Sequence, residues 1–114
     1  CGVHQNYKNK VLKANDIATM STGKRLGHPV RSIKNPYTKE YFKLEYSNIS
    51  DEELEAYGRG SLYRAAVEGD EKTGCFLAGQ IAGMVNKEQT AKEIIEEIFT
   101  QAEDVLKGAT KWVK

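Results

Sequence analysis

The chain has 114 residues, a length that suits one compact domain, and no apolar run approaches the roughly 20 residues of a membrane-spanning helix, so we expect no membrane contact. The net charge is only +1, but residues 1–35 hold seven Lys/Arg and one acidic residue, and this local excess of positive charge favours an anionic partner. Nucleic acid is disfavoured as that partner, because no zinc-finger, helix-turn-helix or RNA-recognition signature is present. Cys1 and Cys75 lie far apart, which favours a reducing, cytoplasmic setting, and no spacing of His, Cys, Asp and Glu predicts a metal site.

The first third of the chain is predicted to contain a helix and two extended segments. Apolar residues recur with helical spacing between Val3 and Ala14. Residues 17–22 carry a β-branched or apolar residue at nearly every position, which predicts a strand. The turn Gly27-His28-Pro29 leads to a second extended piece at residues 30–35, because a residue that precedes proline avoids the helical region.

Two helices are predicted in the middle of the chain. Aromatic residues between Tyr37 and Tyr46 favour a short helix. Ser50 and Glu53 form a capping box, and we expect the helix that starts there to run to about Glu68.

The segment TGCFLAGQIAGMV, residues 73–85, has the most unusual composition. Gly79 and Gly83 lack a Cβ and tolerate positive φ, so the main chain could approach a flat ligand closely. A tight corner whose glycines serve only packing is the alternative interpretation.

A final amphipathic helix is predicted after residue 86. Asn86 is expected to cap it, with Gln89 at the matching position. One apolar face runs along it, formed by Ala91, Ile94, Ile95, Ile98, Phe99, Ala102, Val105 and Leu106.

Four segments together resemble a known enzyme family: VHQNYKNKVLKANDI, GHPVRSIKN, GRGSLYRAAVEGD and LAGQIAGMVNKEQTAKEII. The resemblance is to the carboxyl-terminal third of the FMN-dependent enoyl-acyl-carrier-protein (enoyl-ACP) reductases of bacterial type II fatty-acid synthesis. Nitronate monooxygenases, also called 2-nitropropane dioxygenases, share a related AGQ segment. The opening His-x-x-Tyr-Lys and the GHPVRSIKN segment favour the reductase.

The resemblance implies that the chain is a piece of a longer protein. Its fold class would be mainly α with a few short strands (α+β), as the C-terminal fragment of an FMN-binding (β/α)8 TIM barrel. Residues 1–16 would be the last barrel helix, 17–85 a small lid subdomain and 86–114 a helix that packs back on a missing N-terminal barrel. The loops that hold the FMN phosphate and the catalytic histidine would lie in that barrel, since neither His4 nor His28 matches the histidine. The fragment alone is expected to contain no catalytic residue, to be inactive and to expose apolar surfaces.

The resemblance also implies roles for individual residues. Leu77, Ala78, Gly79 and Gln80 would line the cavity beside the flavin. His4 and Lys8, which stand one helical turn apart, would meet the phosphates of NAD(P)H. Hydride would pass from NAD(P)H to FMN and on to the enoyl thioester, and the whole protein is expected to be a homo-oligomer. A contact with the acidic acyl-carrier protein is expected from Lys24, Arg25, Arg31 and Lys34.

Two alternatives remain open from the sequence. One is a nitronate monooxygenase, which would oxidise alkyl nitronates with the same cofactor. The other is a non-catalytic helical interaction module that uses the small-residue face of residues 54–66.

Overall fold

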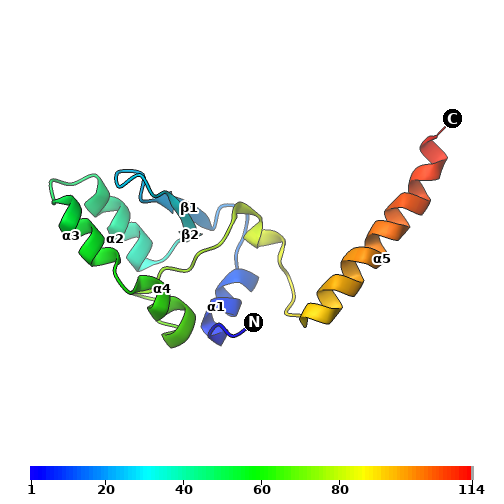
Figure 1. Ribbon diagram of the computed structural model, residues 1–114, viewed down its shortest axis with the longest axis horizontal. Coiled ribbons are helices and arrows are strands. Elements are labelled where there is room, and N and C mark those ends of the chain that lie inside the picture. The colour runs from blue at the N-terminus through cyan, green and yellow to red at the C-terminus, as the bar shows by residue number, and fades with distance from the viewer. Residues whose placement is uncertain (114) are drawn as a thin grey trace.

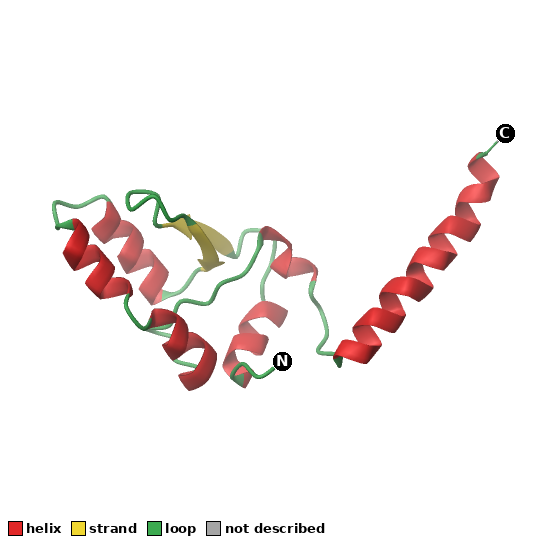
Figure 2. Cartoon of the chain, in the orientation of Figure 1, coloured by secondary structure: helices red, strands yellow, loops and turns green. Residues whose placement is uncertain are grey.

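The computed structural model describes residues 1–113, which form a body of short elements and one long protruding helix (Figure 1). The radius of gyration of 18.4 Å exceeds the roughly 13 Å of a compact domain of this length, because the last helix extends away from the body. The elements are α1 (Gln5–Leu12), β1 (Thr19–Thr22), β2 (Val30–Ile33), α2 (Pro36–Glu45), α3 (Asp51–Gly58), α4 (Ser61–Tyr63), the π-helical turn η1 (Arg64–Glu68), the 3-10 turn η2 (Gln80–Met84), α5 (Ala91–Ala109) and the 3-10 turn η3 (Thr110–Trp112). The chain is therefore mainly helical with one small sheet, as predicted (Figure 2).

Helix α1 confirms the first predicted helix and packs on the body through one side. The imidazole of His4 caps it, with Nδ1 accepting a hydrogen bond from the Asn6 N–H at 3.1 Å. The backbone N–H of His4 donates to the Ala66 carbonyl at 2.7 Å, which ties the start of α1 to η1. Tyr7 and Val11 pack against the buried cluster that contains Phe76.

Strands β1 and β2 form an antiparallel hairpin, in agreement with the two predicted extended segments. The register pairs Thr19 with Ile33 and Thr22 with Val30. Gly23 adopts a φ of +81° at the turn, and a Cβ there would lie 2.6 Å from the His28 carbonyl oxygen, so glycine is required.

Helices α2 and α3 form a hairpin that encloses the second buried cluster. Both begin with capping boxes, Asn35 with Thr38 and Ser50 with Glu53, and the second was predicted. The cluster consists of Tyr37, Tyr41, Leu54 and Cys75.

The predicted length of the helix that starts at Ser50 is wrong. It ends at Gly58, and the chain turns at Gly60, whose φ of +74° is left-handed, before α4 and η1 continue to Glu68. Glycine disfavours the helix interior by about 1 kcal/mol, and two glycines within three residues are enough to break it. Gly69, with a φ of +64°, ends the second piece directly after Glu68, the residue at which the predicted helix was expected to end.

Tyr37, in the cluster between α2 and α3, makes the stability of the body depend on pH. Burial is the largest cause that raises the pKa of Tyr37 from 10.0 to about 12, because the phenolate would lose its hydration. The unfolded chain then loses this proton near pH 10 whereas the folded chain keeps it, so stability should fall by about 2 kcal/mol between pH 10 and 12. Urea unfolding at pH 9 and pH 12, followed in parallel for Tyr37→Phe, measures this effect. The variant should lose less stability over that interval, and an identical loss in both proteins would contradict the assignment.

Helix α5 confirms the last predicted helix but begins later than predicted. Its cap is Thr90, which forms a capping box with Glu93, not Asn86. The residues between these two positions are held in a linker, because Lys87 and Gln89 both bind the Glu97 carboxylate on the first turns of α5. No helix among residues 1–113 is both long and apolar enough to cross a membrane.

The apolar face of α5 has no partner within the described chain. Ile98 is 59% exposed, Phe99 67% and Leu106 70%, and no residue of α5 is buried. Figure 1 shows the helix pointing away from the body. This face is continuous and helical in spacing, so the structure leaves a packing surface uncovered.

Candidate functional site

The segment Leu77–Gln80 is fixed between α1 and β2. The Tyr7 hydroxyl donates to the Leu77 carbonyl at 2.6 Å, and the Ala78 N–H donates to the Arg31 carbonyl at 3.2 Å. An antiparallel bridge between Ser32 and Leu77 extends this pairing, so the segment runs beside β2 like a short third strand. Its main chain is therefore held on both sides.

The two glycines of this segment have different roles. A Cβ on Gly79 would meet nothing within 4 Å, whereas a Cβ on Gly83 would lie 2.7 Å from the carbonyl carbon of Asn15 and 3.0 Å from the Asp16 nitrogen. Neither glycine has a positive φ, so what distinguishes both positions is the absence of a Cβ. Gly83 allows η2 to pack on the chain between α1 and β1, and Gly79 leaves space that is open.

A shallow hollow lies at this open position. It has a volume of about 380 Å³ and is lined by Val30, Arg31, Leu77, Ala78 and Gly79. No side chain projects from Gly79, so a flat ring could lie directly against the main chain.

A second, smaller pocket adjoins the hollow through Val30 and Leu77. Its volume is about 200 Å³, and both His28 and Cys75 line it. Burial raises the pKa of the Cys75 thiol. The thiol therefore stays protonated near neutral pH and acts as a small core side chain, not as a nucleophile.

His4 and Lys8 are engaged elsewhere than at the Leu77–Gln80 segment. The His4 ring caps α1 and occupies the space that a Cβ on Gly69 would take. Lys8 Nζ lies 2.6 Å from Glu88, whose pKa is lowered chiefly by this hydrogen bond. In this structure, Glu88 therefore occupies the position in which a phosphate would pair with Lys8.

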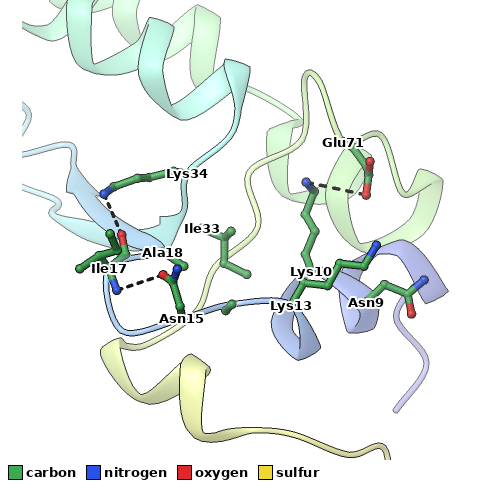
Figure 3. A pocket seen from close by; sticks show the side chains of 10 residues that line it. Asn9, Lys10, Lys13, Asn15, Ile17, Ala18, Ile33, Lys34 and Glu71 are labelled. Carbon is green, nitrogen blue, oxygen red and sulfur yellow. Dashed lines mark hydrogen bonds and ion pairs between the residues drawn. The ribbon is translucent and has the colours of Figure 1, made fainter.

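Three of the four residues expected to meet a carrier protein have internal partners. Arg25 binds Asp51 at 2.9 Å and donates to the carbonyls of Ser47 and Ile49, so it holds the connection between α2 and α3. Arg31 donates to the Thr19 hydroxyl across the hairpin. The ammonium of Lys34 donates to the Ile17 carbonyl at 2.7 Å (Figure 3). Lys24 is exposed on the hairpin turn.

The lysines Lys10, Lys13 and Lys39 were not singled out from the sequence. The structure gathers Lys10 and Lys13 with Lys34 around one groove beside α1 (Figure 3). Two signals could have identified the first two: both lie in the basic first third of the chain, and their spacing of three residues places them on one helical face.

The shape of the hollow limits what the candidate site could hold. The hollow at Gly79 would accept the edge or face of a planar ring, because the space beside this residue is open and most of its neighbours are apolar. The Leu77–Gln80 segment carries no charged side chain, so it offers nothing to neutralise a phosphate. Among residues 1–113 no group of three or more His, Cys, Asp or Glu side chains could hold a metal ion.

Of the three comparisons with known proteins, the one with solved structures gives matches. No protein-family model and no curated protein matches the sequence. Among solved structures, FabK from Thermotoga maritima is similar over 97% of this chain, with 35% identity and a TM-score of 0.90. A mutant of the same FabK matches with 32% identity and a TM-score of 0.79, also over 97% of this chain. The chain spans only 35% of the first of these structures and 32% of the second.

Proposed function

We propose that this chain, which matches a segment of FabK over 97% of its length, is part of an FMN-dependent enoyl-ACP reductase that reduces the double bond of an enoyl thioester with NAD(P)H in fatty-acid synthesis. The observation that carries this proposal is the combination of 35% identity with a TM-score of 0.90, because both the residues and their arrangement agree. FabK is an enzyme of this type.

The division of the chain into three parts is carried over from the family resemblance and belongs to the same proposal. Residues 1–16 would be the last helix of a (β/α)8 barrel, and residues 17–85 would form a lid over its active site. Residues 86–114 would return to the barrel, where the apolar face of α5 would become buried. The exposure of that face supports this arrangement, since a continuous apolar helix face needs a partner.

The Leu77–Gln80 segment would form one wall of the cavity in which the enoyl group meets the flavin. When bound, FMN would supply the hydride chemistry that links NAD(P)H to the enoyl double bond. This chain would position the reactants. The hydrogen bonds from Tyr7 to the Leu77 carbonyl and from the Ala78 N–H to Arg31 fix the wall, and Gly79 leaves room for a planar group. The FMN phosphate would be held by residues outside this chain.

The remaining assignments are part of the same proposal. His4 and Lys8 would lie near the phosphates of NAD(P)H, with Lys8 exchanging Glu88 for phosphate. Lys24, Arg25, Arg31 and Lys34 would contribute positive potential toward an acidic carrier protein, although Arg25 acts mainly within the fold.

Enlarging residue 79 tests the role of the segment. In the full-length enzyme we expect Gly79→Ala to lower kcat/KM modestly and Gly79→Val to lower it about tenfold or more, because the added atoms enter the cavity and not the core. Flavin content and thermal stability should stay at the values of the unmodified enzyme. Steady-state kinetics with an enoyl thioester and the flavin absorbance give both readouts.

Gly83→Val serves as the matched control for this series. Its Cβ would overlap the backbone of Asn15 and Asp16, so this variant should lose about 1–3 kcal/mol of stability. Full activity of Gly79→Val would return the whole segment to a packing role and contradict its place beside the flavin.

A further inference from the structure

Two adjoining grooves rich in lysine run between α1 and the corner where β2 leads into α2. The first has a volume of about 480 Å³ and includes Lys10, Lys13 and Lys34 in its lining (Figure 3). The second, of about 550 Å³, continues along α2 past Lys39 and Lys43. Lys10 and Lys34 line both, so the two form one surface, which we call the lysine groove.

The lysine groove carries an excess of positive charge. Among its lining residues, Glu71 lies 3.7 Å from Lys10 and Glu40 lies 3.5 Å from Lys43. The side chains of Lys13 and Lys39 make no ion pair or hydrogen bond within residues 1–113. Five lysines against two carboxylates leave a net positive surface that faces solvent.

The lysine groove lies on the opposite side of α1 from the surface suited to the rest of an enzyme. An apolar groove of about 380 Å³ includes Val3, Val11, Leu12, Val85 and Ile94 in its lining. At 3.6 residues per turn, Lys10 and Lys13 project away from Leu12 and Lys8. A further part of the protein that packs on the apolar groove and on α5 would therefore leave the lysines accessible.

We propose that the lysine groove is the docking surface for the acidic acyl-carrier protein that delivers the enoyl thioester. This inference rests on the proposed function and names the part of the chain that its carrier contacts. The lysines lie along α1 and at its end, directly after β2, and on α2, and they include no arginine fork. This arrangement suits a row of carboxylates on a protein surface better than one phosphate group.

The position of the lysine groove relative to the hollow at Gly79 supports this choice. Ile33 and Lys34 border the groove at one end of β2, and Val30 and Arg31 border the hollow at the other end. Three residues of a strand span about 10 Å. A carrier docked in the groove would thus hold its thioester arm within reach of the proposed cavity.

Charge reversal at the two unpaired lysines tests the proposal in the full-length enzyme. Lys13→Glu/Lys39→Glu changes one lysine at each end of the groove without breaking an ion pair of the described chain. We expect KM for an enoyl-carrier-protein substrate to rise about tenfold, with a weaker dependence on salt. KM and kcat for an uncharged enoyl N-acetylcysteamine thioester should not change.

The control variant is Lys92→Glu/Lys107→Glu, which alters the net charge equally on α5 and should leave both substrates unaffected. An unchanged KM for the carrier substrate in the groove variant, or an equal rise in KM for both substrates, would overturn the docking surface. If the unmodified enzyme reduces neither thioester, the proposed function itself fails. If it reduces both, and the charge reversal in the groove leaves KM for the carrier-protein substrate unchanged, the docking surface alone fails.

Discussion

The isolated 114-residue chain is expected to self-associate in solution. The apolar face of α5 is exposed along its length, from Ile94 at 44% to Leu106 at 70%, and it lies beyond the body of the fold. Burial of one such side chain stabilises an interface by about 1.5–3 kcal/mol, so several of them together outweigh the cost of association. Sedimentation velocity over a range of concentrations should show dimers or larger species.

Two double variants test whether the apolar face of α5 causes this association. Ile98→Glu/Phe99→Glu places charges on the apolar face and should shift the chain to monomers, without unfolding the body, because neither residue is buried. Thr100→Glu/Gln101→Glu adds the same charge outside the centre of that face and should still associate. A monodisperse monomer of the unmodified chain would contradict the interpretation that α5 lacks its partner.

Replacing Phe76 by alanine is expected to remove about 3–5 kcal/mol from the stability of the body. The Phe76 ring is fully buried, lies 5.0 Å from the Tyr7 ring between centroids, and contacts Ile33 and Ala65. The Lys10 ammonium lies 5.3 Å from its centroid. Loss of the Phe76 ring should therefore weaken the packing of α1 against β2 and disturb the candidate site beside Leu77.

Native-state hydrogen exchange in the full-length enzyme measures this effect locally. The Ile33 amide donates to the Phe76 carbonyl at 2.8 Å, so its protection reports the stability of this contact. Phe42→Ala is the matched control, because that ring is 40% exposed and contacts Tyr46. A loss of less than about 1 kcal/mol at Ile33 in Phe76→Ala would contradict the central place of Phe76 in this core.

Local sequence signals predicted most of the elements. The capping box at Ser50, the stop at Gly69 and the apolar period of α5 each rest on interactions between residues close in the chain, and each is present. The interruption at Gly60 was missed because the apolar spacing continues across it, so periodicity alone favoured one long helix. The start of α5 was misplaced because Glu97, a residue of α5 itself, binds Lys87 and Gln89.

The candidate site was predictable only in part. The composition of residues 77–83 drew attention to the right segment, but composition could not distinguish Gly79, which borders open space, from Gly83, which packs on Asn15. The lysine groove depends on α1 lying beside the β2–α2 corner, and that contact is set by the buried Phe76 cluster. Such a contact between distant segments leaves no signal in the local sequence. The excess of basic residues in the first third of the chain is visible in the sequence, but it does not show where these residues gather.

The central claim is that this chain belongs to an enzyme that reduces enoyl thioesters with a flavin. Two separate assays of the flavin-loaded full-length protein test it most directly: steady-state NAD(P)H oxidation with crotonyl thioester, and O2 consumption with an alkyl nitronate. Rapid NAD(P)H oxidation that depends on the crotonyl thioester, with no oxidation of the nitronate, is the predicted result. Oxidation of the nitronate without reduction of the thioester would contradict the account and assign the chain to a nitronate monooxygenase.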